Sequence, residues 1–299
     1  MSTRSFTLHP LGEFSLRESA LFGFGQREAA PSYDGVLRLA FCLDGGFERQ
    51  VGVEVRQRGE TVECTVHGAG ELSTIERQVA RMLSLDHDAR EFAQVGRRDP
   101  VLRRLQVAAP GLRPPLFHSP YEAAVWSVLS ARRPAQQMAQ VRTALSDAAG
   151  RRFTLAGQPL AALPTPSTLL RLGAFPGIDA ERLERLQGVA RAAAGGRLEA
   201  ARLLALGPAD ALADVQSSKG IGPFYASLIV IRAVGFTDVL PADEPLTREL
   251  VGSLYGLPAA ATAEQFAAIA EPWAPWRTWA SVYVRAVAPR LLATGRLSA

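Results

Sequence analysis

A Gly-X-Gly-Pro turn between two helical segments constrains this chain more than any other feature. Gly220 and Gly222 are free to adopt positive φ, and Ile221 between them can enter a core. Pro223 then suits the first position of a helix, where its missing N–H costs no hydrogen bond. The N–H groups of a first helical turn have no partner within the helix. The turn therefore predicts a backbone site for an anion such as a phosphate.

The segment after the turn predicts a buried helix followed by an acidic loop. Residues Phe224 to Val234 are apolar on nearly every face, which is typical of a helix inside a core, and Gly235 predicts its C-cap. The anion-binding turn is thus expected to be fixed to the core. The loop that follows, from Asp238 to Glu244, reads Asp-Val-Leu-Pro-Ala-Asp-Glu.

Composition indicates a globular chain with a polyanionic partner. The 299 residues predict about two domains on a prior of roughly 150 residues each. The chain is 47% hydrophobic and 21% charged, and it has no run of about 18 apolar residues, so no membrane span is expected. The first residues lack the pattern of a signal peptide, which favours the cytoplasm. A net charge of +4 and a pI near 9.5 favour nucleic acid as partner, and Lys219, the only lysine, lies at the turn.

Cysteines and histidines predict no metal or cluster site. Cys42 and Cys64 fall in strand-like segments and are expected to pack as small apolar side chains without a disulfide. The four histidines show no metal-ligand spacing. No cofactor is expected.

The N-terminal part predicts a small antiparallel sheet with helices. Apolar and polar residues alternate over residues 36–43, 51–57 and 62–67, with glycine-containing turns between them. Ser73 to Glu76 has the pattern of a capping box and predicts a helix that lies across this sheet. We therefore expect an α+β N-terminal domain over residues 1–110.

Beyond a Pro-rich break at residues 109–115, nothing in the sequence reads as a strand. Ser119-Pro-Tyr-Glu122 combines an N-cap, a proline at the first position and a glutamate at the third, which predicts a helix start. We expect an all-α domain over residues 111–299. Outside the turn region its predicted helices cover residues 120–129, 135–148, 167–172, 179–194, 197–205, 208–215, 246–255, 262–270 and 275–292.

These motifs together resemble those of a known family. Lys219-Gly-Ile-Gly222, the Pro-aromatic helix start and Asp238-Val-Leu-Pro-Ala-Asp-Glu244 resemble the helix-hairpin-helix DNA glycosylases with the Gly-Pro-Asp loop. Leu163-Pro-Thr-Pro166 and Glu271-Pro-Trp-Ala-Pro-Trp-Arg277 are similar to the 3-methyladenine DNA glycosylase II branch in the same order. The resemblance covers about residues 110–290. It implies a hydrolase of base excision repair that flips alkylated purines out of double-stranded DNA and cleaves their N-glycosidic bond. The N-terminal part resembles the domain that this branch carries ahead of its helices.

The resemblance also implies how DNA is held. Backbone N–H groups of Gly220, Ile221 and Gly222 and the start of the helix at Pro223, with the Lys219 charge, would bind one strand without reading its sequence.

A second DNA contact is expected where the family places its wedge. The family's Ser/Gly-Gln-Gln/Leu-Ile/Val-Ser loop is replaced here by residues 130–134. Arg132 and Arg133 in that loop would insert into the duplex, hold phosphates, or simply end a helix in solvent.

The resemblance places the catalytic carboxylate in the acidic loop. Cleavage passes through a sugar cation, which a carboxylate near C1′ stabilises. The family has an aspartate where this chain has Glu244, directly after Asp243. A glutamate is longer by one methylene, and Asp243 would replace it only if the loop shifts by one residue. Alternatively, Asp243 or Glu244 merely caps the helix that begins near Pro245.

Bifunctional relatives carry a lysine nucleophile where this chain has Phe224, so the resemblance implies a monofunctional enzyme that leaves an abasic site. An electron-poor alkylated base stacks well on electron-rich rings. We expect base-pocket walls among Trp126, Tyr225, Trp276 and Tyr283.

The alternative from another class is a noncatalytic paralogue that binds damaged DNA but does not cut it, because both the acid and the wedge positions have changed. The two hypotheses differ in whether Glu244 or Asp243 faces a cavity. The family has relatives with an iron–sulfur cluster held by four C-terminal cysteines; here no cysteine follows Cys64, so none is expected. The family pattern implies a monomer associated with the nucleoid.

Overall fold

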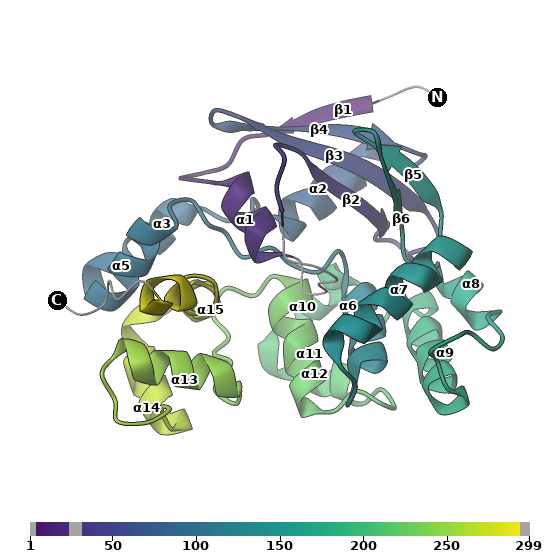
Figure 1. Ribbon diagram of the computed structural model, residues 1–299. Helices are drawn as coiled ribbons and strands as arrows, with labels where there is room; N and C mark the ends of the chain where they lie inside the picture. The colour runs from purple at the N-terminus through teal and green to yellow at the C-terminus, as the bar shows by residue number, and fades with distance from the viewer. Residues whose placement is uncertain (1–3, 24–31, 294–299) are drawn as a thin grey trace.

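A computed structural model describes residues 4–23 and 32–293 of the chain. The described part of the protein is rich in helices and has a four-stranded antiparallel sheet and a two-stranded one, with most of the helices on one side of the larger sheet (Figure 1). The strands are β1 Arg4–Leu8, β2 Leu37–Cys42, β3 Gln50–Arg58, β4 Thr61–His67, β5 Arg152–Leu155 and β6 Gln158–Ala161. The helices before residue 150 are α1 Leu16–Phe22, α2 Leu72–Met82, α3 Ala89–Ala93, α4 Val95–Arg98, α5 Pro100–Ala108, α6 Pro120–Ser130 and α7 Ala135–Ala149.

The remaining helices follow the predicted order closely. They are α8 Pro166–Leu170, α9 Ala180–Ala194, α10 Ala200–Leu206, α11 Pro208–Gln216, α12 Pro223–Ile229, the π-helical turn η1 Val230–Val234, α13 Pro245–Leu254, α14 Ala263–Ile269, the 3₁₀ turn η2 Glu271–Trp273 and α15 Arg277–Ala293. None of the helices in the described part of the chain combines the length and the apolar character that crossing a membrane requires.

The predicted antiparallel sheet is confirmed, with the order β1-β4-β3-β2. Opposite residues such as Val53 and Val66 point to the same face, where they are fully buried. α2 covers this face with Ile75, Val79 and Met82, which lie at helical spacing and are fully buried as well. Strand β1, which pairs with β4, was not predicted.

The predicted capping box of α2 is wrong. The helix begins at Leu72, and Glu71, at the N-cap position, makes no side-chain capping bond. Ser73 lies inside the first turn, and its hydroxyl donates to the Glu71 carboxylate at 2.6 Å instead of accepting from the backbone. The Ser73 hydroxyl therefore bonds the carboxylate of Glu71, two residues earlier, and does not cap the helix as the sequence pattern predicts.

The prediction of no strands beyond residue 111 is also wrong, because β5 and β6 form a hairpin on the outer face of the sheet. Phe153 and Leu155 alternate with exposed residues and pack on Ala40, and Ala156-Gly157 forms the turn with positive φ at both residues. Each strand has only four residues, and β5 has only two alternating apolar positions, too few for a strand signal in the sequence.

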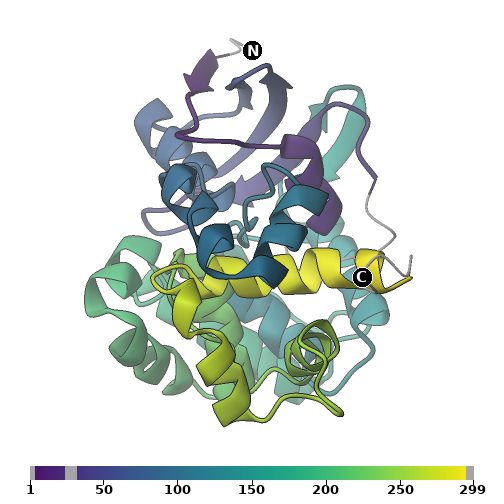
Figure 2. The same ribbon diagram turned by 90° about the vertical axis from the view of Figure 1, so that its left-hand side faces the viewer.

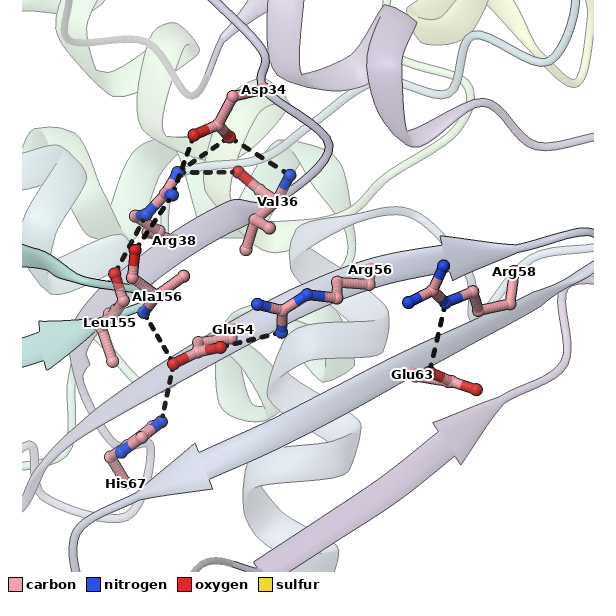
Figure 3. Close-up of polar contacts among 10 residues, drawn as sticks. All are labelled: Asp34, Val36, Arg38, Glu54, Arg56, Arg58, Glu63, His67, Leu155 and Ala156. Carbon is pink, nitrogen blue, oxygen red and sulfur yellow. Dashed lines mark hydrogen bonds and ion pairs between the residues drawn. The ribbon is translucent and has the colours of Figure 1, made fainter.

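Polar contacts fasten this hairpin to the sheet (Figure 3). The Ala156 N–H donates to Glu54 Oε1 at 2.7 Å, and the same oxygen contacts His67 Nε2 at 3.1 Å. Arg38 of β2 donates from Nε to the Leu155 carbonyl at 3.0 Å. The hairpin thus covers part of the outer face of the sheet. The alternation of apolar and polar residues along the strands predicts that this face is exposed.

The helices before the predicted boundary pack against the C-terminal helix. Phe92 of α3 contacts the rings of Trp276, Trp279 and Tyr283, and α15 runs alongside α3 to α5 (Figure 2). Buried Asp99 accepts the Trp273 indole N–H at 2.7 Å and caps α5 through the N–H groups of residues 101 and 102. These contacts join segments between 174 and 191 residues apart in the sequence, from 273 − 99 to 283 − 92.

Arg113 joins the N-terminal segment to this core, and among the described residues no carboxylate pairs with it. The guanidinium is fully buried, and burial lowers its pKa to about 10. It donates to backbone carbonyl oxygens of five residues, Leu11, Gly12, Glu13, Ser84 and His87.

Both cysteines are buried and free, as predicted. Burial raises the pKa of the Cys64 thiol to about 12 and that of Cys42 well above its usual range. They therefore pack as small apolar side chains.

Candidate active site

The predicted hairpin is present between α11 and α12. Gly220 has φ of 94°, which a side chain would strain, and Ile221 is buried in the core, as the sequence predicts. Gly222 takes an extended conformation at the N-cap instead of a positive φ, and Pro223 occupies the first helical position. The first-turn N–H groups of α12 therefore have no acceptor within the helix and lie at an exposed turn.

Lys219 at this turn donates to Glu184 Oε1 of α9 at 3.0 Å. The lysine side chain is 77% exposed, so this ion pair is weak and leaves the charge available to an incoming phosphate.

The helix after the turn ends in a π-helical turn, which the sequence did not predict. η1 spans Val230–Val234, and Gly235 closes it in the left-handed conformation as the predicted C-cap. Its carbonyl oxygens find partners in the N-terminal half: Phe117 N–H donates to Arg232 O at 2.7 Å, and Arg81 Nη1 donates to Ala233 O at 2.6 Å. These bonds replace the regular helical ones that a wide turn loses.

A cavity of about 730 Å³ lies between this helix, the acidic loop and α15. The hairpin helix and the loop residues 239–244 line it, and both Asp243 and Glu244 are among those residues. The contribution of α15 is Thr278, Ser281, Val282 and Arg285, at helical spacing. The cavity is large enough for a purine base.

The acidic loop is fixed to the start of α15. Asp238 accepts from Arg277 Nε at 2.7 Å and from Arg277 Nη2 at 2.6 Å. Burial raises the pKa of Asp238, but the hydrogen bonds and charge of Arg277 outweigh burial and hold that pKa below its usual value. Thr278 Oγ1 accepts the Val239 N–H at 2.8 Å and donates to the Val239 carbonyl. The loop is therefore tied to α15 at two successive residues.

Glu244 caps α13, as one of the alternatives drawn from the sequence states. Its Oε2 accepts the Thr247 N–H at 2.6 Å and also the Thr247 hydroxyl, and its Oε1 lies 3.5 Å from Arg285 Nη1. The side chain is 26% exposed and lines the cavity at the same time. Asp243 is exposed, and no hydrogen bond to its carboxylate comes from any residue that the structure describes. Capping and a place at the cavity wall are thus combined in Glu244.

The structure does not bring the four aromatic residues expected in the base pocket to this cavity. Trp126 is buried within the core around α6, and Tyr225 is half-buried, with its hydroxyl 3.4 Å from Ser130 Oγ. Trp276 and Tyr283 are buried against Phe92, and the Tyr283 hydroxyl donates to the Leu112 carbonyl at 2.7 Å. The packing of α3 to α5 on α15 buries the rings of Trp276 and Tyr283.

Two phenylalanines and two arginines line the cavity instead, and the sequence analysis assigned none of them to a base pocket. Phe224 is 55% exposed, and Phe22 carries the guanidinium of Arg232 at 4.9 Å from its ring centre. Arg285 is the one charged residue in a helix stripe with the spacing 278, 281, 282, 285, which the sequence alone could have indicated. The sequence around Phe22 does not indicate a place at the cavity, because Phe22 reaches the cavity only through the tertiary fold.

The loop expected to hold the wedge connects α6 and α7. Arg132 has φ of 55°, is exposed, and makes no hydrogen bond or ion pair with the part of the chain that is described. Arg133 lies 3.7 Å from Asp179. A non-glycine residue in the left-handed region is strained and is more frequent at functional sites.

No group of three or more potential metal ligands occurs among the residues in 4–23 and 32–293.

Some known proteins are similar to this chain in sequence. A DNA-3-methyladenine glycosylase of Bacillus subtilis is 23% identical over 214 residues, which are 70% of this chain and 71% of the relative. A probable bifunctional transcriptional activator/DNA repair enzyme AlkA of Mycobacterium tuberculosis is 30% identical over 227 residues, or 72% of this chain and 42% of the relative. No protein-family model matches the chain.

Solved structures share the fold over almost the whole chain. MBOgg1 in complex with a low-affinity DNA ligand has a TM-score of 0.73 at 18% identity, covering 97% of this chain and 99% of the other. The 3-methyladenine DNA glycosylase of Archaeoglobus fulgidus has a TM-score of 0.72 at 22% identity, covering 93% and 96%. At these identities the structures establish the fold.

Proposed function

We propose that this chain, whose resemblance to the helix-hairpin-helix DNA glycosylases and their 3-methyladenine branch is confirmed in sequence and in fold, is a monofunctional glycosylase of base excision repair. It would flip an alkylated purine out of double-stranded DNA, hydrolyse the N-glycosidic bond and leave an abasic site. The observation that carries this proposal is that two adjacent carboxylates, Asp243 and Glu244, line a purine-sized cavity beside the hairpin helix.

Glu244 is our candidate for the carboxylate that stabilises the sugar cation. Its Oε2 is held by Thr247 and its Oε1 lies beside Arg285, so the carboxylate has a defined orientation before DNA binds. Such preorganisation is what electrostatic stabilisation requires. Asp243, exposed and without such contacts, is the comparison residue.

The DNA contacts that support this proposal surround the cavity. Residues 219–223 would hold a phosphate, since the Lys219 side chain and the first-turn N–H groups of α12 are exposed. Arg132 and Arg133 would enter or flank the duplex at the strained α6–α7 connection. Phe22 and Phe224 would stack on the flipped base.

The division into residues 1–110 and 111–299 also stays a proposal. In support, residues between Leu8 and Leu85 form a core around the sheet. The helices at residues 89–108 share a core with α15, so we expect the two parts to unfold together.

The test is single-turnover release of 3-methyladenine and 7-methylguanine from methylated duplexes. We expect release by the wild type, a loss of about 10²- to 10⁴-fold for Glu244→Gln, and a much smaller loss for Asp243→Asn, with duplex affinity retained in both. Heating the product in alkali would reveal the abasic site as strand breaks. A wild type that binds the duplex but releases no base would overturn the proposal.

A further inference from the structure

Arg285 is the charged member of the α15 stripe that lines the cavity. Thr278, Ser281 and Val282 complete this stripe, and all four side chains are on one face because they lie three or four residues apart. Arg285 therefore faces the space in which the flipped base would lie.

The Arg285 guanidinium makes no hydrogen bond to the described residues, unlike that of Arg232, the other arginine at the cavity. Its Nη1 is buried and has no hydrogen-bond partner among the described residues; its ion pair with Glu244 Oε1 is long, at 3.5 Å. Arg232, by contrast, donates to the carbonyls of Gly23 and Pro115 at 3.3 and 2.8 Å and stacks on Phe22. Nη1 of Arg285 thus faces the carboxylate. The other two guanidinium nitrogens, Nε and Nη2, make no hydrogen bond to the described residues and are not buried, so their N–H groups are open to an acceptor in the cavity.

The charges that face Arg285 are those of Glu244 and Asp243 from the acidic loop and Arg232 from the hairpin helix. The side chain is 37% exposed, so it is open to the cavity as well as to its neighbours. The wall beside the carboxylates thus carries a permanent positive charge with free N–H groups.

The chemistry of base release gives such a donor a specific use. When the bond between C1′ and the purine nitrogen breaks, its electron pair stays on the base. A water oxygen bonds to C1′, and its proton passes to a carboxylate and then to solvent. A cationic base, such as 7-methylguanine, leaves neutral. An uncharged base leaves as an anion, which takes a proton from water, and this anion is what a guanidinium stabilises.

We infer that Arg285 is a specificity-determining residue that donates to the departing base and extends the substrates of this site to uncharged purines with an acceptor atom. The inference rests on the proposed function. A residue that only oriented Glu244 would affect all substrates equally, whereas a donor to the leaving base affects uncharged bases alone.

The test compares two duplexes in single turnover, one with hypoxanthine, which is uncharged, and one with 7-methylguanine, which is cationic. For Arg285→Gln we expect the rate of hypoxanthine release to fall on the order of 10²-fold, as when one oxyanion donor is removed, with little change for 7-methylguanine. Arg285→Lys, which keeps the charge with a different donor geometry, should recover part of the lost rate. Arg290→Gln, on the same helix but paired with Glu18, is the matched control and should change neither rate.

Equal losses on both duplexes would overturn the inference and make Arg285 a positioning residue for Glu244. Release of 7-methylguanine but not of hypoxanthine by the wild type would overturn it as well, with the proposed function intact. Failure of the wild type to release either base would refute the proposed function and with it this inference. Urea midpoints equal to that of the wild type show that each variant is folded.

Discussion

Glu244 combines two structural roles in one side chain. It caps α13 through Thr247 and stands at the wall of the cavity. An aspartate at this place would reach less far by one methylene. The N-cap position fixes Oε2 against the backbone, so under the proposed function the longer side chain is held in one orientation.

The capping task predicts a stability effect separate from catalysis. Glu244→Ala should lower the free energy of unfolding by about 0.5–2 kcal/mol, since the Thr247 N–H loses its acceptor. Asp243→Ala, at an exposed side chain, is the control and should stay within about 0.5 kcal/mol of the wild type. Urea titration at neutral pH measures both. Equal stability of the two variants would show that the cap contributes nothing.

At the scale of elements, the β5–β6 hairpin depends on the absence of a side chain in the sheet. A Cβ at Gly52 would lie 2.8 Å from Cγ of Phe153 and 2.9 Å from Cδ2 of Leu155. Phe153 packs closely on the strand, and the neighbouring Glu54 holds the hairpin turn (Figure 3). The hairpin therefore contacts β3 at Gly52 and at Glu54, two residues further along the strand.

Gly52→Ala should destabilise the protein by about 1–3 kcal/mol, because the ring of Phe153 must move out of its place. Gly173→Ala is the matched control: a Cβ there meets no atom within 4 Å, and the expected change is within about 0.5 kcal/mol. Chemical denaturation compares the two. The packing described here would be refuted if Gly52→Ala were as stable as Gly173→Ala.

At the scale of the whole molecule, a buried charge network joins the sheet to the helices. Glu122 of α6 is fully buried and accepts from the Cys42 N–H of β2 at 3.3 Å and from Arg142 Nη2 of α7 at 2.9 Å; His118 Nδ1 lies 3.1 Å away. Burial raises the pKa of Glu122, but His118 and Arg142 outweigh it and hold the pKa below its usual value. The carboxylate is therefore a stabilising group in its ionised form.

A depressed pKa contributes stability above the unfolded pKa, near 4.5, and that contribution is lost as the pH falls through the folded pKa. Glu122→Gln should therefore cost about 3–5 kcal/mol at pH 7 by leaving Arg142 buried without its partner. The difference from the wild type should shrink below pH 4.5. Urea unfolding at pH 7 and at pH 3.5 tests this, with the exposed Glu249→Gln as a control close to the wild type at both. A difference that stays constant with pH contradicts the assignment.

The sequence predicted the features that local rules determine. The hairpin turn, the buried Ile221, the caps at Gly235 and Ser119, and most helix bounds follow from residue types at fixed spacing. The position of Asp243 and Glu244 followed from the motif of the acidic loop. Such local features can be predicted without knowing which residues pack against them.

The features that distant packing determines could not be predicted. Whether Trp276 lines a pocket or fills a core is decided by α3, whose Phe92 lies 184 residues earlier (276 − 92) and covers it. The π turn at η1 depends on Arg81 and Phe117, which supply donors to its carbonyls. Phe22 reaches the cavity from a short helix at the other end of the chain.

Arg113 shows how a contact between segments far apart in the sequence can leave no signal in the sequence. Its hydrogen bonds to the described residues all go to main-chain oxygens, so replacing the side chains of the five residues that supply them leaves every acceptor in place. A comparison of relatives that searches for pairs of positions changing together would find no partner for Arg113. The joint is nevertheless specific, because loss of this one side chain would deprive five carbonyl groups of a donor in a buried place.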